Sequence, residues 1–489
     1  MRKTKIVCTM GPATDSLEVL KNMIEAGMNV ARFNFSHGSH EEHQKRIDLV
    51  REARACLSKP VSLMLDTKGP EIRTGTYASG KINIVEGQSF TLSTREIEGD
   101  ETQVSVNYAG LPGDVCVGTR ILIDDGLVAF SVKEINGTDI VCTALNNGTL
   151  SGRKSINIPG LSLNMPYLSD KDKADILFGI NQEIDYIAAS FCRNADDMRQ
   201  LRAFLNENGG KEIGIIAKIE NKEGVDNLGE ILHNVEGIMV ARGDLGVEVP
   251  FEQLPQIQKH LIKEATRHSK VVVTATQMLE SMAHNPRPTR AEVSDVANAV
   301  YDGTSAIMLS GETSVGKYPV ETVQAMSRIA QTAEETIDYE QRRISRGEFK
   351  DMELEGDPKT NAIALAVCST SKDLDAKCIV AFTEGGSTAR AVSGRRPSKP
   401  IVAPTANPKT FHRMAMYWGI TPCLVSRPGS SADLYMQAVG AAARETDAAV
   451  GDVIVVTAGM PVGRVAYTNT LRVIEITPEH LNLAFEENI

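Results

Sequence analysis

The sequence has few of the features that mark secreted, membrane-spanning or disulfide-bonded proteins. Its 8 cysteines are scattered without a C-x-x-C pair, which favours reduced thiols in a cytosolic protein over a disulfide framework. The first residues, MRKTKIVCTM, contain no long apolar core, and no apolar run elsewhere is long enough to span a bilayer. We therefore predict a cytoplasmic protein without membrane segments.

The chain also lacks an excess of positive charge. Its formal net charge is −11 at pH 7, so a general role in binding nucleic acid is disfavoured, whereas a local basic pocket can still bind an anionic substrate. Hydrophobic residues make up 42% and charged residues 24%, a globular composition that excludes a disordered chain. With 489 residues, about two to four domains are expected.

Apolar, β-branched segments alternate with amphipathic helical segments in two parts of the chain, 1–69 and 167–340. The expected strands cover residues 3–7, 29–35, 61–66, 185–190, 213–218, 237–241, 271–276 and 305–309. Such continuous apolar runs are typical of parallel strands that are buried on both faces. Helix-start pairs lie between them, namely Asp15 with Glu18, Ser39 with Glu42 and Thr289 with Glu292. Eight strands, each followed by a helix or once by an insertion, predict a (β/α)8 TIM barrel.

The alternation stops between residues 70 and 166, where short strands and turns predict an inserted small β-barrel domain. Asn136-Gly137 between two β-rich runs is its strongest hairpin signal. A charged stretch from Glu340 to Lys359 is predicted as a linker. Residues 355–489 then form a C-terminal α/β domain, with strands expected at 378–383, 399–404, 452–457 and 471–476.

Polar clusters follow six of the predicted barrel strands. They are RFNFSH (32–37), DTKGPEIR (66–73), KIEN (218–221), RGD (242–244), TQM (276–278) and SGE (310–312). The carboxyl ends of barrel strands surround one mouth, so these clusters should meet there. A lone Lys-x-Glu is usually a solvated surface pair and a lone Arg-Gly-Asp a turn, but their joint placement at strand ends favours function.

These clusters supply the groups that phosphoryl transfer needs. Lys218 and Glu220 are two residues apart and should share a strand face. Glu220 and Asp244 offer carboxylate oxygens that suit Mg²⁺ or Mn²⁺, and Lys218, Arg32 and Arg73 can stabilise phosphoryl charge. The spacing of His37, His40 and His43 could indicate a metal, but polar residues at a helix start are the preferred interpretation.

Several of these motifs resemble the pyruvate kinase family, in the same order along the chain. IIAKIENKEGV (215–225) resembles the active-site signature of that family. The others are RFNFSHG (32–38), LDTKGPEIRTG (65–75), MVARGDLGVEV (239–249), ATQMLESM (275–282) and MLSGET (308–313). The similarity runs from about Thr4 to about Ile476. It implies transfer of the phosphoryl group of phosphoenolpyruvate to ADP, giving pyruvate and ATP, the last step of glycolysis.

The resemblance also implies roles for individual residues. Catalysis is expected of Lys218, Thr276, Ser310 and Glu312, the last three in the protonation of the enolate. Substrate contacts are expected from Arg32, Lys218, Gly243, Asp244 and Thr276. Nucleotide contacts are expected from Pro12, Asn34, His37, Arg73 and Lys154. The Mg²⁺ ligands would be Glu220 and Asp244, and the K⁺ ligands Asn34, Ser36, Asp66 and Thr67. The inserted domain would act as a lid.

Two positions bear on family variants. The family commonly has Gly after the lysine at position 154, where this chain has Ser155. In the family, a glutamate at the place of Glu71 accompanies dependence on K⁺, and a lysine there accompanies independence.

Regulation and assembly are also expected from the resemblance. The loop TEGGSTAR (383–390) joins a strand to a helix, a geometry that suits an anion. Its Thr383, Ser387 and Thr388, with Arg464 of a second loop, would bind a sugar-phosphate or nucleotide effector. A homotetramer is expected. Two rivals remain at this point: a metal-dependent aldolase or lyase acting on pyruvate-like substrates, and an inactive sugar-phosphate sensor.

Overall fold

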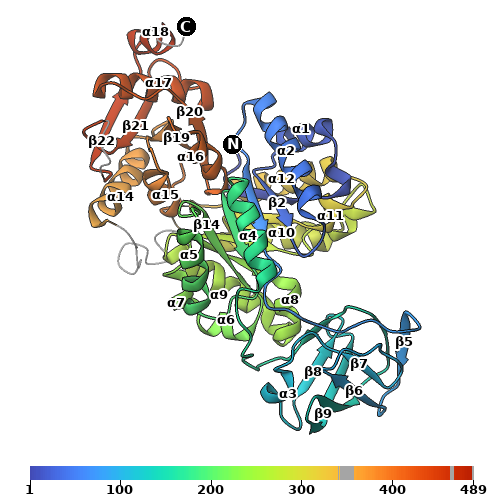
Figure 1. Ribbon diagram of the computed structural model, residues 1–489. Coiled ribbons are helices and arrows are strands. Elements are labelled where there is room, and N and C mark those ends of the chain that lie inside the picture. The colour runs from blue at the N-terminus through green and yellow to red at the C-terminus, as the bar shows by residue number, and fades with distance from the viewer. Residues whose placement is uncertain (340, 342–356, 463–466, 487–489) are drawn as a thin grey trace.

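The computed structural model describes residues 1–339, 341, 357–462 and 467–486. Figure 1 shows three parts in a row, with the barrel between the inserted domain and the C-terminal domain. The predicted limits at 340, 355 and 489 lie outside the described residues, as does most of the predicted linker. Among the described helices, none is both long and apolar enough to cross a membrane.

The first part is a closed eight-stranded parallel barrel, with strand order β1-β17-β16-β15-β14-β13-β3-β2. Its strands are β1 Lys5–Thr9, β2 Val30–Asn34, β3 Ser62–Asp66, β13 Tyr186–Ala189, β14 Gly214–Ile219, β15 Gly237–Ala241, β16 Val271–Ala275 and β17 Ala306–Leu309. All eight predicted strands are therefore confirmed, with ends shifted by one or two residues. Each is buried almost throughout, as expected for strands covered on both faces.

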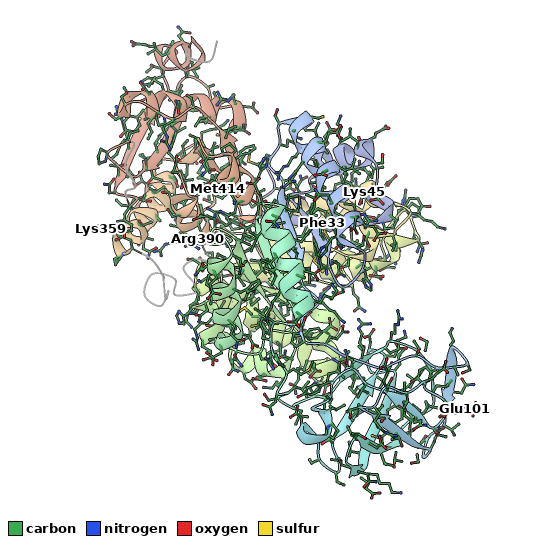
Figure 2. The ribbon with its side chains drawn as sticks, viewed as in Figure 1. Phe33, Lys45, Glu101, Lys359, Arg390 and Met414 are labelled. Carbon is green, nitrogen blue, oxygen red and sulfur yellow. The ribbon has the colours of Figure 1, made fainter. Side chains whose placement is uncertain are left out.

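Helices surround this barrel. They are α1 Leu17–Ala26, α2 His40–Leu57, α4 Asp170–Asn181, α5 Ala195–Glu207, α6 Lys222–Asp226, α7 Leu228–Leu232, α8 Arg242–Glu248, α9 Leu254–Arg267, α10 Arg290–Asp302, α11 Gly311–Ser314 and α12 Pro319–Glu335. Their apolar faces pack on the outward side chains of the strands, among them Phe33 (Figure 2). The capping boxes of Ser39 with Glu42 and of Thr289 with Glu292 are confirmed.

The predicted Asp15–Glu18 capping pair is wrong. The N-cap of α1 is Ser16, and no side chain caps it. The Asp15 carboxylate instead forms an ion pair with Arg46 of α2, at 2.7 Å. The Asp15 carboxylate therefore binds the guanidinium of Arg46 and does not cap the helix.

The inserted part is all-β apart from the short α3 (Leu111–Asp114). Its strands are β4 Ile72–Arg73, β5 Lys81–Ile84, β6 Ser89–Ser93, β7 Gln103–Ser105, β8 Arg120–Ile123, β9 Val128–Asn136, β10 Asp139–Ala144, β11 Gly148–Ser151 and β12 Ser155–Asn157. The hairpin predicted at Asn136-Gly137 joins β9 to β10, and Gly137 has φ 61°, as a tight hairpin turn requires. The strands of this inserted β domain form a seven-stranded sheet and a separate two-stranded one.

The C-terminal part is a five-stranded sheet flanked by helices, in the strand order β20-β19-β18-β21-β22. Its elements are α14 Pro358–Asp373, β18 Cys378–Ala381, α15 Ser387–Gly394, β19 Ile401–Thr405, α16 Pro408–Arg413, β20 Ile420–Leu424, α17 Ser431–Thr446, β21 Val453–Ala458, β22 Thr470–Glu475 and α18 Pro478–Glu486. The sequence predicts four of these strands and misses β20. Pro422 lies inside β20, and a proline is tolerated there because β20 is an edge strand.

The C-terminal part packs against the amino-terminal ends of the barrel strands. One continuous buried cluster contains Val7, Met64 and Tyr186 of the barrel together with Met414 and Tyr417. The Tyr186 hydroxyl also donates to the Arg413 carbonyl at 2.9 Å. The carboxyl ends of the strands, where the predicted site residues lie, therefore face away from this contact.

Candidate active site

Lys218, near the carboxyl end of β14, lies at the centre of the predicted site. Its Nζ is 3.1 Å from Asp66 Oδ1, 3.0 Å from Glu220 Oε1 and 2.8 Å from Ser190 Oγ. Glu220 lies on the same face as Lys218, as the two-residue spacing predicted. Burial alone would lower the pKa of Lys218, but the carboxylates of Asp66 and Glu220 outweigh it and raise this pKa above its ordinary value. Lys218 is thus a fixed positive charge.

Arg32, on β2, is held beside the lysine by the same carboxylate. Its Nε is 2.6 Å from Asp66 Oδ2, and another guanidinium nitrogen donates to Thr9 Oγ1 at 2.9 Å. Burial would raise the pKa of Asp66, yet Arg32 and Lys218 hold it below the ordinary value. Two cations therefore flank one ionised carboxylate.

Glu220 and Asp244 form a pair of carboxyl groups within hydrogen-bonding reach of each other. Glu220 Oε2 also accepts from the backbone N–H of Phe191 at 2.6 Å. Burial, with Asp244 nearby, raises the pKa of Glu220 to about 7, and burial also raises the pKa of Asp244. Two crowded buried carboxyl groups fit a divalent cation, which would relieve their repulsion. Mg²⁺ commonly takes one or two carboxylates and completes its shell with water and phosphate oxygens.

A short turn after β16 places Thr276 beside Gly243, the second residue of α8. The Gly243 backbone N–H donates to Thr276 Oγ1 at 2.8 Å. Thr276 and Gln277 have φ values of 70° and 53°, a conformation that costs free energy, especially for a β-branched residue. Arg242 fixes this turn, since its guanidinium donates to the carbonyls of Ala275 and Thr276 at 3.2 and 2.6 Å.

Glu312 is fully buried at the start of α11 and fastens two loops together. Its carboxylate accepts from the backbone N–H of Ser310 at 2.6 Å and of Leu279 at 3.2 Å. Burial raises the pKa of Glu312. The predicted relay residues Thr276, Ser310 and Glu312 therefore lie on loops that one carboxylate ties together.

The predicted K⁺ ligands lie on the adjacent strands β2 and β3. Asn34 and Asp66 are partners in the register of these strands, and Ser36 and Thr67 follow them. Asn34 Oδ1 accepts from the backbone N–H of Ser36 at 3.1 Å, so the amide oxygen points along this loop. The set supplies carboxylate, amide, hydroxyl and carbonyl oxygens, which suit a hard cation.

The predicted nucleotide residues come from two places. Arg73 of β4 and Ser155, which follows Lys154, are partners across the β4–β12 pairing. Arg73 forms an ion pair with Glu71 at 2.7 Å, and Lys154 forms one with Asp124 at 2.9 Å. Pro12 and His37 are exposed on barrel loops. His43, in contrast, stacks on Phe35 at 4.0 Å between ring centroids.

Of the predicted effector residues, Thr383 lies in the loop before α15, whereas Ser387 and Thr388 are the first two residues of that helix. Ser387 is exposed, whereas Thr383 and Thr388 are each 5% exposed. Thr383 Oγ1 accepts from the Gly386 N–H at 2.9 Å, and the Thr388 hydroxyl is 2.7 Å from that of Thr468. Arg464 lies outside the described residues.

Sequence reasoning gave no role to three residues that position the site. Ser190 links Lys218 to Asp66, Thr9 binds Arg32, and Arg242 holds the Thr276 turn. Thr9 and Ser190 lie at the carboxyl ends of the two barrel strands that received no polar cluster in the sequence. The strand-end rule, applied to all eight strands, would have found both.

Comparison with known proteins decides the family. The chain matches the family "Pyruvate kinase, barrel domain" over residues 1–323 and "Pyruvate kinase, alpha/beta domain" over residues 361–474. The chain belongs to the pyruvate kinase family. The pyruvate kinase of Clostridium acetobutylicum is 47% identical over 477 residues, covering 97% of this chain and 99% of that protein. That of Geobacillus stearothermophilus is 47% identical over 474 residues, covering 96% and 80%.

A solved structure agrees with the sequence matches. The crystal structure of a pyruvate kinase from Cryptosporidium parvum has a TM-score of 0.91 and 39% identity, covering 97% of this chain and 96% of that one. The predicted family, fold class and enzyme class, a phosphotransferase, are confirmed. The aldolase or lyase and the inactive sensor are set aside by the same matches.

Proposed function

We propose that the chain transfers the phosphoryl group of phosphoenolpyruvate to ADP at the mouth of its barrel, giving pyruvate and ATP. The observation that carries this proposal is the arrangement of Lys218 and Arg32 around Asp66, beside the Glu220–Asp244 pair. Production of pyruvate from phosphoenolpyruvate and ADP, followed by coupling to lactate dehydrogenase, tests it. If no pyruvate forms when both Mg²⁺ and K⁺ are supplied, the proposal is contradicted.

Each group at the mouth has a role in this reaction. Arg32 and Lys218 bind the phosphoryl oxygens, and Lys218 stabilises the charge that the group carries during transfer. Glu220 and Asp244 would hold Mg²⁺ or Mn²⁺, which supplies further neutralisation of phosphoryl charge. The Gly243 backbone, Asp244 and Thr276 position the carboxylate end of the substrate. Thr276, Ser310 and Glu312 lie where the enolate left behind takes its proton.

The inserted domain supplies the nucleotide side of the site. Arg73 and Lys154, on paired strands of that domain, would contact the phosphates of ADP, with Pro12, Asn34 and His37 on the barrel side. Asn157 of β12 donates to Glu248 of α8 at 3.0 Å, which ties the inserted domain to the helix that carries Asp244. Closure of this domain over the mouth would exclude water, which otherwise competes for the phosphoryl group.

We expect activity to require K⁺ as well as Mg²⁺. In K⁺- and Na⁺-free Tris buffer the rate should fall by at least about tenfold, because an oxygen set at Asn34, Ser36, Asp66 and Thr67 would lack its cation. Glu71→Lys should recover part of the lost rate, since an ammonium group can replace the charge of the ion, whereas Glu71→Gln should not. Steady-state rates over a KCl titration measure this, and full activity of the unmodified protein without K⁺ would count against the K⁺ site.

We also propose a cytoplasmic homotetramer that responds to a phosphorylated effector bound at the 383–388 loop. The effector should lower the apparent KM for phosphoenolpyruvate by favouring one state of the tetramer. Titrations with fructose 1,6-bisphosphate, AMP, ribose 5-phosphate and glucose 6-phosphate at subsaturating substrate test the response, and light scattering tests the tetramer.

The loop itself is tested by Thr383→Ala/Thr388→Ala, which should abolish the response and leave kcat nearly unchanged. Thr360→Ala, on α14 of the same domain, is the matched control and should respond normally. If the double variant responds like the unmodified protein, or if none of the four compounds shifts the curve, this loop is an ordinary turn.

A further inference from the structure

Two histidines at the start of α2, His40 and His43, have no part in the reaction described above. They follow directly after the loop of residues 35–38, which extends from the carboxyl end of β2. Among the described residues, no group of three or more His, Cys, Asp and Glu side chains is placed to hold a metal, so the spacing of these histidines does not mark a metal site. His43 instead contacts the 35–38 loop, and His40 contacts the helix α4 (Figure 1).

His43 holds the loop through one hydrogen bond to its main chain. Its Nε2 lies 2.8 Å from the His37 carbonyl oxygen, and because a carbonyl only accepts, Nε2 carries the proton and donates it. The ring is 4% exposed and stacks on Phe35 with 4.0 Å between ring centroids. Its other nitrogen, Nδ1, is buried without a hydrogen-bond partner among the described residues. A buried unpaired nitrogen costs stability that an apolar side chain would not, which points to a use of the Nε2 donor.

A second side chain holds the same loop from α4. Lys171 Nζ donates to the Phe35 carbonyl at 2.9 Å, and it also forms an ion pair with Asp175, one helical turn further along, at 2.6 Å. Asp175 is 3% exposed, and its other carboxylate oxygen lies 2.7 Å from His40 Nε2. One buried carboxylate therefore fixes both the lysine that binds the loop and the histidine at the start of α2.

The main chain of this loop turns closely against the His43 ring. Gly38 has φ 80°, and a Cβ at that position would come within 3.4 Å of His43 Nε2. The carbonyls of Phe35 and His37, two residues apart, accept from donors on α4 and α2 respectively. Both donors therefore act on the segment that carries Ser36 and His37, which are expected to contact K⁺ and the nucleotide.

We propose that His43 is a positioning residue for nucleotide binding, which holds the 35–38 loop so that His37 faces ADP, and that Lys171 supports the same loop from α4. This inference rests on the proposed function, because His37 is a nucleotide contact only in that proposal. His43 acts through the His37 carbonyl and does not itself touch the nucleotide. Loss of its hydrogen bond weakens the binding of ADP, whereas the ion pairs that hold Lys218 and Arg32 for phosphoenolpyruvate stay in place.

Steady-state kinetics of His43→Leu and His43→Gln, at saturating Mg²⁺ and K⁺, test this inference. Leucine keeps an apolar contact with Phe35 but has no donor, so KM for ADP should rise by about fivefold or more, as the loss of one hydrogen bond implies. KM for phosphoenolpyruvate, and kcat at saturating ADP, should stay within about twofold of the unmodified protein. Glutamine carries an amide N–H at a similar distance from the main chain, so His43→Gln should recover most of the affinity for ADP. A role in folding alone would not separate the two KM values in this way.

A variant on α4 tests the same loop without altering the core. The Lys171 side chain is 50% exposed, so Lys171→Met should fold normally and should also raise KM for ADP. Lys173→Met is the matched control, because Lys173 lies on the same helix and pairs with Asp170 at 3.7 Å; its KM for ADP should be normal. The inference is overturned if His43→Leu and Lys171→Met keep a normal KM for ADP, if KM for phosphoenolpyruvate rises equally, or if His43→Gln is no better than His43→Leu. If the unmodified protein forms no pyruvate, the proposed function and this inference fail together, whereas normal pyruvate formation with an unchanged KM for ADP in the variants overturns the inference alone.

Discussion

Replacing Lys218 with methionine is expected to lower kcat by about 10³-fold or more. Methionine fills a similar volume but removes the charge that lies 3.0 Å from Glu220 and 3.1 Å from Asp66. Because that charge acts on the phosphoryl group mainly during transfer, kcat and kcat/KM for phosphoenolpyruvate should fall together. Steady-state kinetics at saturating Mg²⁺ and K⁺ measure both constants.

The fold should survive this substitution. Asp66 keeps its ion pair with Arg32 at 2.6 Å, and Glu220 keeps its hydrogen bond from the Phe191 N–H. Lys222→Met is the matched control, because Lys222 begins α6 four residues further along the chain, is exposed and, among the described residues, pairs only with Asp226. It should retain near-normal activity. A kcat for Lys218→Met within about tenfold of the unmodified protein would exclude the proposed role.

The sequence predicts the barrel well because each of its strands is buried on both faces. Continuous apolar runs such as 213–218 and 237–241 are hard to accommodate elsewhere in a soluble fold. The period of two residues along a strand then places Lys218 and Glu220 on the same face without any structure. This argument does not apply to the edge strand β20, because an edge strand needs no long apolar run and tolerates Pro422.

The residues that position the site are less visible in the sequence. Arg242 acts through the carbonyls of Ala275 and Thr276, and no spacing rule connects residues more than thirty positions apart. Ser190 is similar, because its importance comes from lying between Lys218 and Asp66 in space. Sequence patterns indicate the chemical groups at the strand ends, whereas their hydrogen-bonded supports depend on how the loops pack.

Replacing Glu220 with glutamine is expected to weaken binding of the divalent cation and to leave the fold intact. Glutamine keeps the shape of the side chain and can still accept from the Phe191 N–H through its amide oxygen. It removes one of the two carboxylates that would hold Mg²⁺, so half-saturation by Mg²⁺ should require at least about tenfold more metal and kcat should fall by about 10²-fold. Rates over an MgCl₂ titration at saturating phosphoenolpyruvate measure both effects.

Thermal unfolding provides a readout that does not depend on activity. Burial raises the pKa of Glu220 to about 7. The stability linked to its protonated form is therefore fully present only below the ordinary pKa of a glutamate and is lost as the pH rises through about 7, so at pH 8 the ionised carboxylate carries a penalty in the metal-free protein. Glutamine removes this penalty, so the metal-free Tm of Glu220→Gln at pH 8 should equal or exceed that of the unmodified protein.

Mg²⁺ with phosphoenolpyruvate should raise the Tm of the unmodified protein by mass action and raise that of Glu220→Gln much less. Asp226→Asn, at an exposed carboxylate on α6, should keep the full Mg²⁺-dependent rise; a normal rise in Glu220→Gln would show that Glu220 does not bind the metal.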